Sequence, residues 1–357
     1  MSSFTTEFGH KIEFVPGYFE ANKKYNAHVD ASDHAFDAEL RTFSGGKRWD
    51  FWHPAKDYVN LSAIIYFLRR HQVLQNWERG IDLGGAEGAS IALMKAAGYI
   101  KHATNSDIYD YSPVIGPGYF RSFIEFLSTV YESESEEAMQ TRKIMARTRY
   151  SFDYFPQQGA MTGLLNSFPH SAEIDVNLHG NMMDLNEQYD FVMSCGVFEH
   201  LDLDQVLAKV SALLSRGGTF ACMDGYWWFP VNSAGFVGHF PYMLQRLSAS
   251  DLERYMTGYH PEAWPALRKR YSHINGGKLR PTISDWIALG HKHCLRTVAV
   301  ERIMPARHHR IPEVPAKLFR QPYFDPSEVL RDIAAIRDGV VIEDLMTSAL
   351  RIAMVKI

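Results

Sequence analysis

Residues 80–88 read Gly-Ile-Asp-Leu-Gly-Gly-Ala-Glu-Gly, and this stretch decides the fold. Residues 79–83 are typical of a short buried strand, and the glycines after them let the backbone turn sharply and approach a ligand closely. Residues 89–97 are a helix-forming run, which Gly98 is suited to end. A strand, a glycine turn and a helix in this order predict the start of a βαβ unit, with a nucleotide-like ligand at the turn.

The same alternation of strand and helix extends to both sides of this stretch. Apolar residues at 61, 64, 65 and 68 mark one face of a preceding helix, and those at 206, 207, 210, 213 and 214 mark one face of a later helix. Further strands are expected at 102–107, 172–178, 189–194, 219–224, 294–303 and 349–357. This pattern favours a doubly wound α/β sheet that is mostly parallel.

The chain divides into an N-terminal segment and one elaborated domain. We expect residues 1–74 to form a helical or lid segment and residues 75–357 to form a Rossmann-like domain. Insertions are expected at about 108–172, 225–290 and 304–345, and they should be largely helical, because long structureless loops are uncommon in compact domains. Together with the N-terminal segment they are predicted to form a cap.

Composition excludes several classes of protein. The formal net charge of the 357 residues is −4, which gives no electrostatic footprint for nucleic acid or for an anionic membrane. No apolar run approaches the roughly 18 residues of a membrane helix, and the first residues do not resemble a signal peptide. Three cysteines are too few for a disulfide framework, so a reducing, cytoplasmic setting is expected.

Polar residues follow two of the predicted strands. Asp107 ends the second strand, 19 positions after Gly88, where an acid accepts hydrogen bonds from ribose hydroxyls. Residues 189–201 read Tyr-Asp-Phe-Val-Met-Ser-Cys-Gly-Val-Phe-Glu-His-Leu, a fourth strand that leads into a polar segment.

These segments together resemble the motifs of class I S-adenosylmethionine-dependent methyltransferases. Asp82–Gly88 resembles the first motif of the family, with Ala86 in place of its middle glycine, and Asp107 matches the ribose-binding acid. Gly180–Met182 resembles the segment that recognises adenine, with Asn181 in place of the usual acid; its amide oxygen can still accept from the adenine amino group.

Two later segments add to the resemblance. Residues 190–201 resemble the fourth-strand motif with its Glu-His-Leu ending, and residues 214–220 resemble the Leu-x-Pro-Gly-Gly turn, with Arg216 in place of proline. The resemblance implies a seven-stranded sheet with one antiparallel strand in its final pair, and S-adenosylmethionine as cofactor. It implies these cofactor-binding residues: Asp82, Gly84, Gly85, Ala86, Gly88, Asp107, Ile108, Asn181, Met182, Ser194 and Cys195.

His239 is the candidate general base. It lies in residues 235–242, after the fifth strand, and resembles the Gly-His-x-Pro segment of some small-molecule methyltransferases. A histidine near its free pKa suits proton removal at neutral pH. The alternative is that it only hydrogen-bonds a loop backbone.

Tyr226, Trp227 and Trp228 are candidates for the substrate site, either as an aromatic wall or as core of the insertion. His200 is a further candidate there, with a structural role as the alternative. Residues 291–294 and the pair His308 and His309 lack the paired spacing of a zinc site, so no metal is expected.

The function expected from these features is methyl transfer to a small-molecule acceptor, most directly to an oxygen, with nitrogen, sulfur or carbon as alternatives. An extensive cap fits a small acceptor better than nucleic acid or a protein surface. A catalytically silent domain that binds a partner is a second hypothesis, because Ala86, Asn181 and Arg216 depart from the motifs. An NAD-dependent oxidoreductase is a third. The oligomeric state is also open, a homodimer included.

Overall fold

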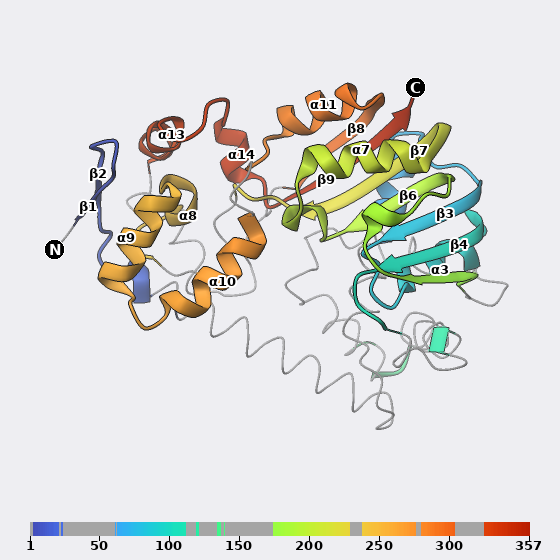
Figure 1. Ribbon diagram of the computed structural model, residues 1–357, viewed down its shortest axis with the longest axis horizontal. Coiled ribbons are helices and arrows are strands. Elements are labelled where there is room, and N and C mark those ends of the chain that lie inside the picture. Colours follow the sequence, from blue (N-terminus) through green and yellow to red (C-terminus); the bar gives the residue numbers. More distant parts are fainter. Residues whose placement is uncertain are drawn as a thin grey trace.

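The computed structural model describes residues 3–20, 23, 61, 63–111, 119–120, 134–136, 139, 174–228, 238–275, 280–303 and 325–357. These residues form a central sheet with helices against its faces and a further group of helices beyond one end of it (Figure 1).

The central sheet has seven strands in the order β5-β4-β3-β6-β7-β9-β8. The strands are β3 (Trp77–Leu83), β4 (Ile100–Asp107), β5 (Val176–His179), β6 (Tyr189–Cys195), β7 (Leu214–Gly225), β8 (Leu295–Ile303) and β9 (Ala349–Lys356). Strands β3 to β7 pair in parallel, whereas β9 runs antiparallel to both β7 and β8. The predicted fold class is therefore confirmed, including the antiparallel strand in the final pair.

The strand order reverses at β3, which has β4 on one side and β6 on the other. In open α/β sheets such a switch point leaves a crevice at the carboxyl ends of the strands, and ligands bind there. In Figure 1 the arrowheads of β3 and β4 point toward the side of the molecule where helices α8, α9 and α10 lie.

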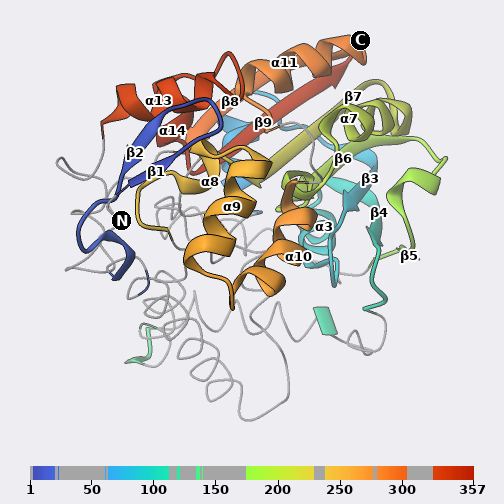
Figure 2. The same cartoon turned by 60° about the vertical axis from the view of Figure 1, so that its left-hand side comes forward.

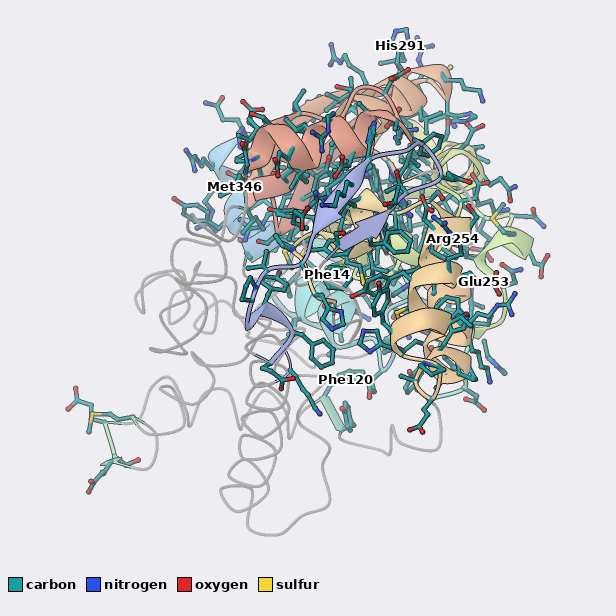
Figure 3. All side chains as sticks on the ribbon, turned by 90° about the vertical axis from the view of Figure 1, so that its left-hand side faces the viewer. Phe14, Phe120, Glu253, Arg254, His291 and Met346 are labelled. Carbon is teal, nitrogen blue, oxygen red and sulfur yellow. The ribbon has the colours of Figure 1, made fainter. Side chains whose placement is uncertain are left out.

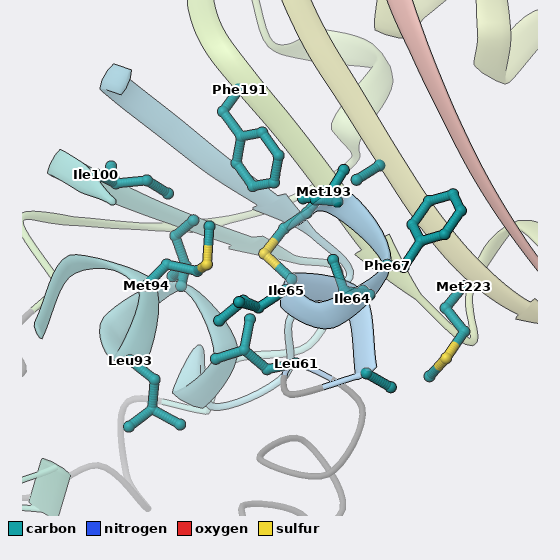
Figure 4. Close-up of a cluster of buried hydrophobic side chains, with 14 of the residues drawn as sticks. Leu61, Ile64, Ile65, Phe67, Leu93, Met94, Ile100, Phe191, Met193 and Met223 are labelled. Atoms are coloured by element: carbon teal, nitrogen blue, oxygen red, sulfur yellow. The ribbon is translucent and has the colours of Figure 1, made fainter. Parts of the chain in front are cut away.

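One face of the sheet is covered by helix α3 (Ala89–Ala96) and by the helical residues 63–70. The predicted apolar face is confirmed, because Leu61, Ile64, Ile65 and Leu68 are all buried. Figure 4 shows Leu61, Ile64 and Ile65 in the same cluster as Leu93 and Met94 of α3. Each such side chain contributes about 1.5–3 kcal/mol when buried, so this layer anchors the turn that precedes α3.

The other face carries α7 (Leu203–Leu213) and α11 (Ile283–Lys292). Thr282 and Asp285 form the reciprocal capping box at the start of α11 that the sequence indicates. We expected α11 to belong to the cap insertion, but it contacts α7 and β8 instead. Its Ile283 and Trp286 are buried in the core of the sheet's second face, so this part of the insertion covers the sheet.

A group of helices lies beyond one end of the sheet, and we name it the cap (Figure 1): α8 (Met243–Arg246), α9 (Ala249–Tyr259), α10 (Trp264–Asn275), α13 (Pro326–Ala334) and α14 (Ile342–Met346). Arg246 and Asp332 are both buried, and the guanidinium Nη2 lies 2.6 Å from the carboxylate Oδ2. This ion pair joins α8 to α13. Removing Asp332 would leave the buried Arg246 guanidinium without the carboxylate that it pairs with.

Residues 3–13, at the start of the expected helical or lid segment, form a ribbon of two antiparallel strands, β1 (Ser3–Thr5) and β2 (Lys11–Glu13). The ribbon docks on α9, since the Glu7 amide donates to Asp251 at 2.9 Å. Figure 2 shows the ribbon beside α8 and α9. Most of the predicted insertion 108–172 and of residues 21–60 lies outside the described residues.

Within the described part of the chain, no helix is long and apolar enough to cross a membrane.

Candidate functional site

The turn between β3 and α3 has a backbone that only small residues allow. Gly84 and Gly88 have φ angles of +74° and +78°, in the left-handed region that favours glycine. A Cβ on Gly85 would lie 2.2 Å from Oδ1 of Asn105 and 2.8 Å from Cγ of Asp82. The turn therefore sits directly on two side chains of the neighbouring strands, and its outer surface is left half-exposed for a ligand.

Ala86 stands where the motif that this stretch resembles has its middle glycine, and its φ of +48° lies in the left-handed region. An L-residue there costs roughly 1–2 kcal/mol, whereas glycine costs about 0.4–1 kcal/mol in chain entropy. We therefore expect Ala86→Gly to stabilise the protein by about 0.5–1 kcal/mol.

Chemical denaturation of Ala86→Gly tests this expectation. Ala97→Gly is the matched control, because Ala97 has an ordinary φ of −76° and should lose about 0.5–1 kcal/mol. Equal losses in the two variants would mean that position 86 is not strained.

Asp107 lies at the end of β4 and holds the turn in place. Its Oδ2 accepts the Ala86 amide at 3.0 Å and its Oδ1 accepts the Tyr109 amide at 2.9 Å. A carboxylate offers about four acceptor positions, so Asp107 keeps acceptor capacity toward a ligand. The sequence indicated this residue, but not its bond to the turn.

Asn105 supports the turn from beneath, and the sequence analysis missed it. It is fully buried, and its Nδ2 donates to the Ala86 carbonyl at 2.8 Å. A polar residue inside a predicted strand was the available signal, since a buried amide needs hydrogen-bond partners.

The end of β5 brings Asn181 close to Asp107. The Gly180 amide donates to the Asp107 carbonyl at 2.9 Å, and the His179 ring nitrogen Nε2 lies 3.0 Å from the Ile108 carbonyl. The side chain of Ile108 is 64% exposed beside them. Asn181 Oδ1 already accepts the Met183 amide at 3.0 Å, which leaves its second lone pair and its NH₂ group for a ligand.

Ser194 and Cys195 lie at the end of β6. Ser194 is fully buried, and its hydroxyl donates to the Leu83 carbonyl at 2.8 Å, so its side chain joins β6 to β3 rather than facing the edge. Cys195 is partly buried and packs against the core under residues 63–70. Met182 is likewise partly buried, against the core of the other face.

Asp224 at the end of β7 is a further residue that sequence analysis missed. It is buried, and its Oδ1 accepts the amides of Val197 at 2.8 Å and Phe198 at 3.3 Å. The Cys222 thiol lies 2.6 Å from Oδ2. Burial, with the nearby Glu199 carboxylate, raises the pKa of Asp224 to about 7.

This raised pKa makes stability depend on pH. Folded Asp224 keeps its proton up to about pH 7, while the unfolded group loses it near 3.8, so its contribution is full below pH 4 and is lost as the pH rises through 7. We expect the free energy of unfolding to fall between pH 5 and pH 7 by on the order of 1 kcal/mol per pH unit. Urea titrations at a series of pH values should show this slope, and Asp224→Asn should remove it; an unchanged slope in the variant would contradict the assignment.

The aromatic residues after β7 were candidates either for a substrate wall or for core. Tyr226 and Trp228 are buried: the Tyr226 hydroxyl donates to Asp344 at 2.6 Å, and the Trp228 indole donates to the Pro281 carbonyl at 3.2 Å. Both side chains belong to the buried core of the sheet's second face, which favours the core alternative for these two residues. Trp227 is partly buried between the sheet core and the cap, with the Arg280 guanidinium 5.4 Å from its ring.

The histidines singled out in the sequence have different surroundings. His200 is exposed, with Nε2 3.4 Å from the Glu199 carboxylate. His293 joins α11 to α7 through Asp204, at 2.6 Å. Within the described ranges no group of three or more potential metal ligands gathers, and His308 and His309 lie outside those ranges.

His239 belongs to an aromatic cluster in the cap. Its ring stacks on Phe14 with centroids 4.8 Å apart and on His260 with centroids 5.3 Å apart. Figure 3 labels Phe14 beside the N-terminal ribbon. Burial lowers the pKa of His239, so the ring is neutral at pH 7.

Tyr255 contacts both the backbone amide and the ring of His239. The Tyr255 hydroxyl accepts the His239 amide at 2.8 Å and lies 2.5 Å from Nδ1. The hydroxyl can donate to Nδ1, which places the ring proton on Nε2, or it can accept from Nδ1–H in the other tautomer. Proton removal at Nε2 then requires the other tautomer, with Nδ1–H donating to Tyr255.

One continuous edge thus lies at the switch point, and it consists of the half-exposed turn, Asp107, Ile108 and Asn181. This edge offers a carboxylate for hydroxyl donors, an exposed apolar side chain for a planar ring, and an amide for a polar ring edge. These features fit a nucleoside-bearing cofactor such as S-adenosylmethionine.

Comparison with known proteins finds similarity only in structure. No family model matches the chain, and no curated protein matches its sequence. The chain is similar to a putative sarcosine dimethylglycine methyltransferase from Galdieria sulphuraria, at 13% identity over 83% of this chain and 85% of that one, with a TM-score of 0.39. It is also similar to geranyl diphosphate C-methyltransferase from Streptomyces coelicolor A3(2), at 13% identity over 83% and 79% of the two chains, with a TM-score of 0.37.

Proposed function

We propose that this protein transfers a methyl group from S-adenosylmethionine to a small-molecule acceptor. The observation that carries the proposal is the bond between the Asp107 carboxylate and the Ala86 amide, which places an acid of β4 on the glycine turn of β3. The motifs in residues 82–88 and 190–201, which resemble those of class I methyltransferases, support the same assignment.

The residues of the edge have separate tasks in this proposal. Asp107 accepts the ribose hydroxyls, Ile108 packs on the adenine ring, and Asn181 hydrogen-bonds the ring's polar edge. The glycine turn lets the cofactor approach the backbone closely. When bound, S-adenosylmethionine supplies an electrophilic methyl group on its sulfonium, and the protein holds that group in line with the acceptor atom.

We further propose that the acceptor atom is an oxygen and that His239 removes its proton. The neutral ring of His239 supports this role, because only the neutral form accepts a proton. The cap also supports a small acceptor, since α10 contacts the 3₁₀ turn Phe198–His200 that follows β6. Methylation at nitrogen, sulfur or carbon is the alternative.

Asp107→Ala should weaken the binding of S-adenosylhomocysteine by about 10- to 100-fold, because it removes a charged acceptor worth roughly 1.5–3 kcal/mol. Asp107→Asn should lose less affinity for S-adenosylhomocysteine, since its amide oxygen still accepts one amide of the turn. Calorimetric titration measures both variants, and circular dichroism confirms that they are folded. An Asp107→Ala variant that binds as the wild type does would contradict the assigned cofactor edge.

Turnover is tested by incubating the protein with S-adenosylmethionine and pools of small hydroxylated, carboxylated, amine and thiol compounds. Formation of S-adenosylhomocysteine, with a product heavier by one methylene group, supports the proposal, and NMR of the product identifies the methylated atom. Cofactor binding without turnover, with a stable complex on pull-down, would favour the silent partner-binding domain instead. A cofactor absorbing near 340 nm after reduction would identify the oxidoreductase.

A further inference from the structure

Val197 packs directly on the first glycine of the turn. A Cβ on Gly84 would lie 2.4 Å from Cγ2 of Val197 and 2.9 Å from its Cγ1, so the isopropyl group fills the space beside the Gly84 backbone. Val197 follows β6 and is only partly buried. The segment after β6 is thus one wall of the turn that receives the cofactor.

Hydrogen bonds to the end of β7 fix the position of Val197. Its amide donates to Asp224 Oδ1 at 2.8 Å, the Phe198 amide reaches the same oxygen at 3.3 Å, and the Gly196 amide donates to the Met223 carbonyl at 2.9 Å. Three successive amides of one segment are therefore held by the end of β7. The bonds to Asp224 lie in a buried site, where a lost partner costs more than at the surface.

We propose that Asp224 is a positioning residue for the cofactor site, because its carboxyl group holds Val197 against Gly84 and so sets the shape of the glycine turn. This inference rests on the proposed function and extends it by a residue that does not touch the cofactor. The groups that face Asp224 are the Cys222 thiol on its own strand and Glu199 on the segment after β6. Among the described residues, the Val197 and Phe198 amides are bonded to Asp224 Oδ1 and to neither of these two groups.

Asp224→Ala tests this role with two readouts. We expect faster hydrogen exchange at the Val197 and Phe198 amides, and about 10-fold weaker binding of S-adenosylhomocysteine. Asp224→Asn should keep most of the wild-type amide protection and most of the wild-type affinity, because its Oδ1 still accepts the two amides. Asp190→Ala is the matched control: Asp190 also accepts a backbone amide, from Arg79 at 3.1 Å, but at the amino end of β6.

A second variant keeps the proposal testable if Asp224→Ala does not fold. Val197→Ala trims only the methyl groups that contact Gly84, and it should weaken binding of S-adenosylhomocysteine by a similar factor. Wild-type affinity in folded Val197→Ala or Asp224→Ala would overturn the inference, as would an equal loss in Asp190→Ala. If the wild type itself does not bind S-adenosylhomocysteine, the proposed function fails. Hydrogen exchange at the amides of residues 84–88 in Val197→Ala still tests the positioning role. Faster exchange than in the wild type supports the role, and unchanged exchange overturns it.

Discussion

Gly85→Ala should abolish the binding of S-adenosylhomocysteine in calorimetric titration. The added Cβ would meet Asn105 at 2.2 Å and Asp82 at 2.8 Å. Both neighbours are short, buried side chains, and Asn105 is tied to the Ala86 carbonyl, so the turn must move instead. Overpacking of this kind costs about 1–3 kcal/mol of stability, and we expect more than about 100-fold loss of affinity from the displaced turn.

Gly258→Ala is the matched control for this result. Gly258 lies in helix α9, has no atom within 4 Å of an added Cβ, and should gain about 0.5–1 kcal/mol of stability from the same substitution. Its affinity for S-adenosylhomocysteine should equal that of the wild type. If Gly85→Ala binds with wild-type affinity, the cofactor does not use this turn.

His239→Ala should lower kcat by about 100-fold or more, within the usual range for loss of a general base. The affinity for S-adenosylhomocysteine should not change, because His239 belongs to the cluster in the cap rather than to the glycine edge. Burial lowers its pKa below 6.5, so the wild-type rate should fall on the acid side, at a pH lower than 6.5. The assay uses the acceptor that the turnover trial identifies.

Tyr255→Phe separates this role from a structural one. The ring stays in the buried core of the cap, while the hydroxyl that contacts His239 Nδ1 is lost. The rate should fall by about 10-fold, with a shifted acid limb in the pH profile. If the rate of His239→Ala depends on pH as the wild-type rate does, His239 is not the general base and its role is structural.

The sheet was predictable because its signals are local. Apolar runs, the glycine turn and helix caps such as Thr282 with Asp285 act within a few residues, and each appears where the sequence indicates it. The same holds for Asp107, which ends a strand next to the glycine turn in the sheet order.

The supporting contacts were not predictable, because they join residues far apart in the chain. Asp224 and Val197 are 27 positions apart and meet only once β6 and β7 pair. The N-terminal ribbon docks through Glu7 on Asp251, 244 positions away. Likewise, the placement of Tyr226 depends on Asp344 in α14, so the sequence left its role open between core and substrate wall.

Titration of the wild-type protein with S-adenosylhomocysteine is the most direct test of the central claim. We predict saturable binding with one site per chain. The absence of binding by a folded protein would contradict the assignment of this edge to S-adenosylmethionine.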